Sequence, residues 1–490
     1  MAKTTRPDGR LRTRRVAAVP VALATLALTQ TAASATPPIP GPKGNDVASV
    51  LDRLNAHRLV VTDGIERTTY SSSKKSDRLV VRVAVIDPDK GAISLGSTVG
   101  EGVGVRETTS AMLKTVGTSK TNAPYVGVNG GYSVAFKGQN AQGKGVSEER
   151  SVPLVASIQE DVVQGASCLT GQNAVVLQHG RPHFTRITTS IEIRSSDGAR
   201  RSVDGVNRYP GWISFCRQGD DDRPLPFKKD AKGKKIYLDE RGRAITSGPY
   251  YEDAGEIVAF TSAYGLKTPK PGHSSWVGAD NAEGVQVQLN AQGVVVKKQS
   301  TKVPLDVPAK GMVLQGIGPK SDPGSGAEWL RDHAKVGMKL RYTQRATDIG
   351  FTADTADDER LALDPAHPSI DVVNGTHLLM RNGKVVAKPG DNKKLDPRTA
   401  IGTDSEGRTL LVTVTSKKDG DRLGVPIHEL AKIMADLGAV DALNLDGGGS
   451  TTFVADGERQ SPPSDKEGER PVYDAVYAGR GGHGLPATGR

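Results

Sequence analysis

Two glycine-rich turns carry the residues of this sequence that could do chemistry. One is Asn129-Gly130-Gly131 and the other is Asp446-Gly447-Gly448-Gly449, and each follows a short apolar run. Consecutive glycines tolerate positive φ and can aim successive N–H groups at one point, which makes an anion-binding nest. A carboxylate beside such a nest suits a ligand that has both an anionic group and a centre that becomes cationic. The alternative is a tight turn in which Asp446 only caps neighbouring N–H groups, and the spacing leaves both open.

The common catalytic motifs are absent from the sequence. His428-Glu429 lacks the second histidine of a zincin, and Gly272-His273-Ser274-Ser275 lacks the closing glycine of a nucleophile elbow. The triple glycine has no lysine after it, so it is not a P-loop. The nine histidines are scattered, and we predict no transition metal and no cofactor. The acidic triplet at 220–222 could supply oxygen ligands for Ca²⁺, but a solvated loop is the better interpretation.

Apolar patterning indicates the elements that position the two turns. It predicts strands at 79–86, 123–128, 409–414 and 439–445, and helices at 108–116 and 426–437. The last strand delivers Asp446 directly to its end. Residues 150–345 read as short strands separated by Gly, Asp and Asn turns. We therefore predict an α+β fold, β-rich, of mixed sheets with a few helices. Both ends of the chain compose one site, and 150–345 forms a β-rich insertion or lobe.

The N-terminus predicts export. Residues 1–15 carry six basic side chains and one acidic one, 16–28 are apolar, and Ala33-Ser34-Ala35 fits a signal-peptide cleavage site after Ala35. Thirteen apolar residues are too few to span a bilayer. Without this segment the net charge falls from +10 to +5, which is too mild to indicate a nucleic-acid partner. We predict a secreted, extracellular protein with no membrane span. Arg14-Arg15 leaves twin-arginine export open.

The remaining boundaries follow from composition. Residues 36–64 read as a linker and lead-in, 65–482 as one domain, and 483–490 as a tail. Gly and Pro together are 86 of 490 residues, which indicates a folded chain with many turns. In an oxidising compartment we expect Cys168 and Cys216 to form a disulfide, although two unrelated buried thiols remain the alternative. The tail contains Leu-Pro-Ala-Thr-Gly at 485–489, without the hydrophobic stretch of a sortase signal.

Several motifs, in order, resemble the phosphodiester glycosidase family, which includes a lysosomal enzyme that removes N-acetylglucosamine from a phosphodiester. They are Val126 to Tyr132, Pro397 to Gly402, and Asp441 to Thr452, with weaker similarity at 205–208, in the helix 424–438 and at 468–472. The resemblance runs over roughly 65–475. Three positions depart from the family pattern: Tyr132 replaces a phenylalanine, Asn374-Gly375-Thr376 replaces Gly-Gly-Pro, and the stretch after Val472 replaces the usual Ala-Asn-Ala ending.

The resemblance implies hydrolysis of the C1–O bond of a sugar-1-phosphodiester. Phosphate is a good leaving group, so one carboxylate can suffice where ordinary glycosidases need two. The implied catalytic residues are Asp446 near C1, Arg398 on the phosphate, and Asn129. Asp446 could be nucleophile, base or electrostatic partner. The other predicted substrate- or phosphate-binding residues are Gly130, Gly131, Thr399, Gly447, Gly448, Gly449, Ser450 and Thr451, with Arg208 and Arg470 as weaker candidates.

Simpler roles compete with these. Arg398 could be a surface or salt-bridge residue, and Asn129 could be only a turn residue. The expected partner is a phosphosugar or a glycan-phosphodiester substrate. The alternative to an enzyme is a secreted, non-catalytic protein that binds phosphosugars or cell-wall polymers. A structural protein whose glycine turns only shape the fold is a third hypothesis.

Overall fold

The computed structural model describes most of the chain after residue 49. The described residues are 50–91, 93–117, 124–139, 145–153, 157–159, 162–165, 172–178, 180–211, 213, 216, 222–238, 242–244, 251–253, 255–269, 283–318, 323–351 and 370–480. Within these ranges, no helix combines the length and the apolar character needed to cross a membrane. The predicted signal peptide, the tail and Cys168 lie outside the described residues.

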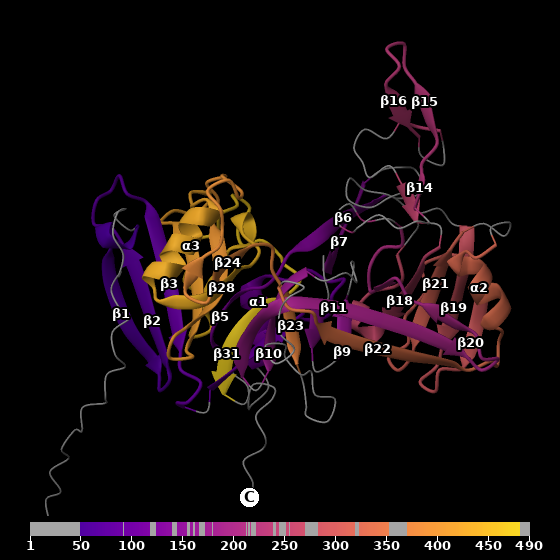
Figure 1. The fold of residues 1–490 in the computed structure, drawn as a ribbon, viewed down its shortest axis with the longest axis horizontal. Coiled ribbons are helices and arrows are strands. Elements are labelled where there is room, and N and C mark those ends of the chain that lie inside the picture. The colour runs from indigo at the N-terminus through magenta and orange to yellow at the C-terminus, as the bar shows by residue number, and fades with distance from the viewer. Residues whose placement is uncertain are drawn as a thin grey trace, which may run out of the picture. The chain divides into compact units, whose positions relative to one another are not determined.

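An eight-stranded sheet carries two of the predicted site segments (Figure 1). Its central strands β3 and β27 are buried along their whole length, as expected for near-continuous apolar runs. Residues on β26 and at the end of β28 supply Arg398, Thr399 and the turn that holds Asp446. The order of its strands is β1 (Asn55–Thr62), β2 (Ile65–Ser71), β3 (Leu79–Ile86), β27 (Thr409–Ser416), β26 (Arg398–Asp404), β28 (Ala439–Asn444), β24 (Leu378–Arg381) and β25 (Lys384–Val385).

A five-stranded sheet carries the Asn129 turn. Its order is β30 (Glu458–Arg459), β29 (Phe453–Ala455), β5 (Pro124–Asn129), β31 (Ala475–Arg480) and β4 (Ile93–Thr98). One apolar core contains residues from this sheet and from the eight-stranded sheet, with members from Ile65 to Ala478. Segments from both ends of the chain therefore share one core, as predicted.

Two further sheets are built mainly from the middle of the chain. The first has the order β12 (Arg200–Ser202), β11 (Arg181–Ser195), β10 (Gln172–Gln178), β23 (Asp371–Asn374), β8 (Ser157–Gln159) and β9 (Val162–Gly165), with β22 (Leu340–Asp348) on β11. The second has the order β13 (Gly205–Val206), β18 (Ile257–Thr261), β21 (Met312–Ile317), β19 (Glu283–Leu289) and β20 (Val295–Thr301). Their apolar residues form a second core.

Three strand pairs stand apart from these sheets. They are β6 (Ser133–Gln139) with β7 (Gly145–Pro153), β14 (Asp222–Pro224) with β17 (Tyr251–Asp253), and β15 (Phe227–Lys229) with β16 (Lys235–Tyr237).

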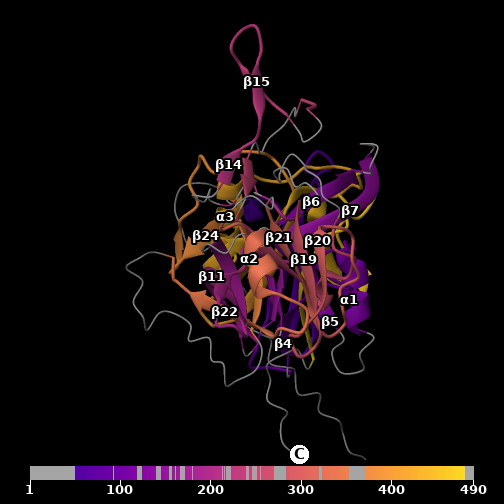
Figure 2. The ribbon, with the colours of Figure 1, turned by 90° about the vertical axis from the view of Figure 1, so that its right-hand side faces the viewer.

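Helices cover three of the sheets, and the helix Thr109–Gly117 packs on β5 and β31. The α-helices are α1 (Thr109–Gly117), α2 (Gly326–His333) and α3 (Ile427–Asp436), and the short 3₁₀ turns are η1 (Leu51–Arg53), η2 (Ser262–Tyr264) and η4 (Gly448–Ser450). α3 packs on β24 and β28, and α2 packs on β19 and β21 (Figures 1 and 2). The buried face of α3 is its predicted apolar face, with Ile427, Leu430, Ala431 and Met434.

The predicted fold class is confirmed, because the described chain is β-rich with several sheets and few helices. The strands and helices predicted outside 150–345 agree with the observed ones to within two residues at each end. Within 150–345 the strands predicted at 191–193 and 285–296 are wrong in extent, because β11 runs from Arg181 to Ser195 and 285–296 is divided between β19 and β20. The domain boundaries drawn from composition stay predictions.

Candidate functional site

The two glycine turns meet, although they lie more than 300 residues apart in the sequence. The N–H of Asp446 donates to the carbonyl of Gly130 (3.0 Å), and the Asn129 Nδ2 donates to the carbonyl of Asp446 (2.8 Å). The Asn129 Oδ1 accepts from the Thr399 Oγ1 (2.7 Å) and from the backbone N–H of Thr452 (3.1 Å). Asn129 and Thr399 are fully buried, so this amide links β5 of one sheet to β26 of the other. Asn129 thus holds both turns together by its side chain.

Most of the glycine N–H groups predicted to bind an anion already have partners. Gly130 donates to the carbonyl of Asp474 (2.9 Å), and Gly131 donates to the Asp474 Oδ1 (2.8 Å). Gly447 donates to the Oδ1 of Asp446, and Gly448 donates to the carbonyl of Pro397 (both 2.8 Å). For the Gly449 N–H we find no acceptor within the described part of the chain. Of the five glycine N–H groups, four hold the turns in shape, and in the described part of the chain only that of Gly449 has no acceptor.

Positive φ is required at Gly448, where φ is +63°. A β-carbon at Gly449 would collide with Asp465 and Arg470. These glycines therefore let charged side chains approach the turn closely.

Burial raises the pKa of Asp446 above its ordinary value. Hydrogen bonds from Ser450 and from the Gly447 N–H act in the opposite direction, as do the charges of Arg470 and Arg106. The carboxylate is thus held in a polar turn but is poorly solvated. A group in this state accepts a proton more readily than an exposed aspartate does.

Arg398 is neither on the surface nor in a salt bridge. Its side chain is 2% exposed, and its Nε and Nη2 donate to the carbonyls of Val425 (2.8 Å) and Lys394 (2.7 Å). Among the residues that the structure describes, no carboxylate forms an ion pair with it and nothing accepts from its Nη1. Burial lowers the pKa of Arg398, while the neighbouring Tyr132 and Asp396 raise it. A buried cation without a counterion is costly unless an anion completes its surroundings.

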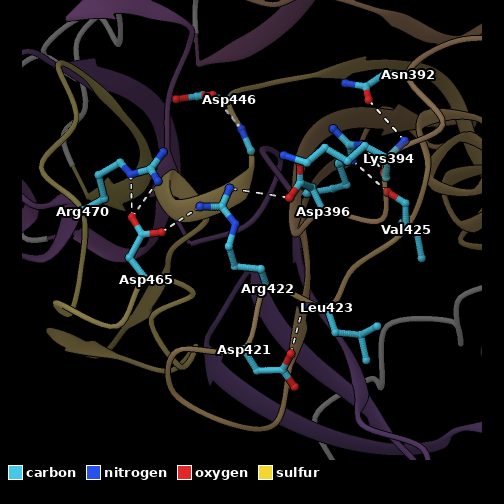
Figure 3. Close-up of polar contacts among 12 residues, drawn as sticks. Asn392, Lys394, Asp396, Asp421, Arg422, Leu423, Val425, Asp446, Asp465 and Arg470 are labelled. Carbon is cyan, nitrogen blue, oxygen red and sulfur yellow. Dashed lines mark hydrogen bonds and ion pairs between the residues drawn. The ribbon is translucent and has the colours of Figure 1, made fainter.

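A chain of ion pairs runs beside the triple glycine (Figure 3). Arg470 donates to the Asp465 Oδ2 through Nε (2.7 Å), and Arg422 Nη1 pairs with the Asp465 Oδ1 (2.9 Å). Asp396 continues the chain to Lys394 Nζ (2.7 Å) and to Arg422 Nη2 (3.5 Å). The three cations exceed the two carboxylates by one charge, so this side of the turn stays positive. Arg470 therefore lies next to the Asp446 turn, as predicted, but its guanidinium is held by Asp465.

Arg208 is placed among other partners. It forms a buried ion pair with Glu256 and donates to the carbonyls of Tyr209 (2.9 Å) and Gly211 (3.1 Å). Within the described structure, its hydrogen bonds and its ion pair all lie within 204–256, around β13 and β18. The structure thus gives Arg208 a role in the middle sheet and does not bring it to the other predicted site residues.

The hydroxyl-bearing residues of the predicted site are buried. Thr399 donates to Asn129, Ser450 bonds the carboxylate of Asp446, and the Thr451 Oγ1 has no hydrogen-bond partner in the described structure. The described residues contain no group of three or more His, Cys, Asp or Glu placed to hold a metal ion. Asp220 and Asp221 lie outside them, and the cofactor prediction stays untested. The Cys168–Cys216 disulfide also stays a prediction, because Cys168 is not described.

Sequence reasoning missed Asp474. Its side chain is 1% exposed, its Oδ1 accepts from the Gly131 N–H, and its Oδ2 has no hydrogen-bond partner in the described structure. The pKa of Asp474 is raised to about 7, mainly by burial and to a smaller extent by the charge of Asp446, against the opposing effect of the hydrogen bonds of Tyr473 and the Gly131 N–H. Neighbouring Asn374 donates to the hydroxyl of Tyr473 (2.6 Å) and accepts from the N–H of Tyr132 (2.8 Å). The available signal was a single carboxylate in the apolar run 472–478.

We predict that Asp474 makes the free energy of unfolding decrease as the pH rises. Its pKa of about 7 in the folded chain is raised from 3.8, so the folded state binds an extra proton between these values. The free energy of unfolding should therefore decrease as the pH rises from about 4 to about 7. In Asp474→Asn this decrease should be smaller, by up to about 1.4 kcal/mol per pH unit. Urea unfolding at several pH values in this window measures it, and an unchanged pH dependence in Asp474→Asn would contradict it.

The fold and the site together define a class. This is a β-rich protein in which segments from both ends of the chain bring a partly buried carboxylate turn close to a buried guanidinium. Among the described residues, this guanidinium has no carboxylate partner. Residues 283–478 match the family model of phosphodiester glycosidases. The mouse and human N-acetylglucosamine-1-phosphodiester alpha-N-acetylglucosaminidases are 32% and 31% identical to the chain over 123 residues. Residues 283–478 are thus similar to the phosphodiester glycosidase family, which is the family that the motifs of the sequence resemble.

The similarity has a limited extent. The match spans 22% of this chain and 23% and 24% of the mouse and human proteins, so the chain matches about a quarter of their length. The family model covers Arg398 and Asp446 but not Asn129. A solved structure of a candidate exported protein from Burkholderia pseudomallei has a TM-score of 0.61, covering 89% of this chain and 97% of that one. At 20% identity that likeness shows a common fold alone.

Proposed function

We propose that the chain is a hydrolase that cleaves the C1–O bond of a sugar-1-phosphodiester. The observation that carries this proposal is Arg398, a buried guanidinium with no carboxylate partner among the described residues. It lies at the start of β26, beside the end of β28 that leads into the Asp446 turn. The names of the curated relatives support the substrate class, because those proteins act on an N-acetylglucosamine-1-phosphodiester. Water adds to C1, the C1–O bond breaks, and the products are a reducing sugar and a phosphomonoester.

The roles of the residues follow from their surroundings. Arg398 binds the phosphate and stabilises the negative charge that develops as it leaves. Asp446 stabilises the positive charge that develops at C1 and accepts the proton of the attacking water. Asn129 is a positioning residue, because its amide is fully used in holding Asp446 and Thr399. The Gly449 N–H donates to the phosphate beside Arg398.

The proposal includes export. Residues 1–35 have the pattern of a signal peptide, and a structural relative is a candidate exported protein. An extracellular site would give the enzyme access to phosphodiester-linked glycans. The Cys168–Cys216 disulfide would fit the same compartment.

The test is hydrolysis of a panel of sugar-1-phosphodiesters, led by N-acetylglucosamine-1-phosphodiesters. The purified full chain should release sugar and phosphomonoester in equal amounts. The neutral methyl glycoside of N-acetylglucosamine should be a much poorer substrate, since it offers Arg398 no phosphate. A folded sample that binds members of the panel saturably but releases no product would replace the enzyme by the binding-protein hypothesis. No binding and no product would reject both.

A further inference from the structure

The hairpin of β15 and β16 is a strand pair on its own. Phe227 pairs with Tyr237, Lys228 with Ile236 and Lys229 with Lys235 (Figure 1). Among the strands that the structure describes, none of another sheet pairs with this hairpin. The turn between the strands is fixed by Asp230, whose Oδ1 accepts from two backbone N–H groups, both at 2.9 Å. This hairpin belongs neither to the Asp446 site nor to either core.

The hairpin concentrates positive charge. Residues 227–237 contain five lysines, Lys228, Lys229, Lys232, Lys234 and Lys235, and the single acid Asp230. All five lysines are exposed, and within the described structure none of them forms an ion pair. Their charges stay uncompensated, because the turn occupies Asp230. Eleven residues thus carry a net charge of +4, most of the predicted mature chain's excess of +5.

Aromatic contacts order the base of this charged hairpin. The rings of Phe227 and Tyr237 lie 5.7 Å apart across the strands. The Nζ of Lys235 sits 4.4 Å from the centroid of the Phe227 ring, close enough for a cation–π interaction. The lysines are therefore presented from a paired, turn-locked backbone rather than from a random segment, which lowers the entropic cost of binding.

We propose that this hairpin binds a linear polyanion, and specifically a phosphodiester-linked glycan or alditol polymer. Several lysines on a short hairpin match repeated phosphates, and binding then gains from counterion release. The two aromatic side chains of the hairpin, Phe227 and Tyr237, lie at its base. Phe227 is 41% exposed, but it contacts Tyr237 and lies under Lys235. Residues 228–235 between them add no aromatic side chain for stacking bases and no apolar side chain larger than Ala231 for entering a membrane. The choice of a phosphodiester polymer rests on the proposed function, and the polyanion binding rests on the hairpin alone.

The test compares two five-lysine variants of the full chain. In one, Lys228, Lys229, Lys232, Lys234 and Lys235 become glutamine. In the matched control, the exposed lysines Lys74, Lys75, Lys297, Lys310 and Lys335 become glutamine. The two variants have the same net charge, so a difference in their polymer affinity reports on the hairpin and not on the overall charge of the protein. Thermal unfolding should agree between them, because surface substitutions of this kind change stability little.

Binding to poly(glycerol phosphate) is measured by fluorescence anisotropy at about 50 and 200 mM salt. The hairpin variant should bind at least about 10-fold more weakly than the control variant and lose most of the salt dependence. Hydrolysis of a small N-acetylglucosamine-1-phosphodiester should be the same in both variants. Absence of small-substrate hydrolysis in the parent chain would reject the proposed function but not polyanion binding.

Two results would overturn the inference. One is equal polymer affinity in the two variants. The other is a hairpin-dependent affinity for duplex DNA or for phosphatidylglycerol vesicles that exceeds the affinity for poly(glycerol phosphate).

Discussion

Asp446→Asn should reduce hydrolysis of a sugar-1-phosphodiester by at least about 1000-fold, because it removes the charge and the base from the reacting centre. The asparagine keeps an Oδ1 that can accept from the Gly447 N–H, at 2.8 Å in the parent chain, so the turn should persist. Stability should not fall. The pKa of Asp446 is raised by burial, so the ionised side chain opposes folding near neutral pH, and a neutral amide removes that term.

A matched control lies on the same strand. Asp441 of β28 pairs with Arg381 (3.3 Å) and is partly exposed, so Asp441→Asn removes a carboxylate of the same type outside the turn. We expect near-parental hydrolysis and a loss of stability below about 1 kcal/mol. Steady-state kinetics and thermal unfolding of both variants measure this. An Asp446→Asn chain that unfolds far more easily than the Asp441→Asn chain would favour a purely structural turn.

The sequence predicted the parts of the fold that follow local rules. The runs 79–86 and 409–414 are almost entirely apolar, apart from Arg82, Thr409 and Thr413, and they form buried central strands. The helix face with Ile427, Leu430 and Met434 packs as its spacing indicates. The sequence predicted that Asn129 and Asp446 each follow a buried strand in a polar glycine turn. The hydrogen bond between them requires two sheets to share one core, and no local sequence pattern encodes that arrangement.

The rest of the site depends on tertiary contacts. The glycines suggested free N–H groups, but Asp474, distant in sequence from both turns, occupies two of them. Arg208 and Arg398 look alike in the sequence, and only the fold pairs the first with Glu256 and leaves the second without a described counterion. Contacts between residues far apart in the sequence, such as Arg208 with Glu256 and Gly131 with Asp474, are therefore the information that the sequence pattern lacked.

Arg398→Gln should weaken binding of inorganic phosphate by about 10- to 150-fold, since hydrogen bonds to a charged group contribute about 1.5–3 kcal/mol. The loss in kcat/KM on the phosphodiester should be larger, because the guanidinium also stabilises charge that develops as the bond breaks. The phosphate affinity and kcat/KM of Arg398→Lys should lie between those of the parent chain and of Arg398→Gln, since lysine keeps the charge but not the planar fork. Isothermal titration with phosphate measures the binding term separately from turnover.

A second buried arginine, changed in parallel, separates the effect of lost stability from the loss of phosphate binding. Arg408 is 3% exposed and donates through Nε to the Asp404 Oδ2 (2.7 Å), at the turn between β26 and β27. Arg408→Gln breaks a buried pair and should destabilise the chain by about 3–5 kcal/mol. Arg398→Gln leaves two carbonyls without their donor and should cost less, about 1–3 kcal/mol. The more stable variant should thus be the one that loses phosphate binding, and equal phosphate affinity in the two would remove Arg398 from the site.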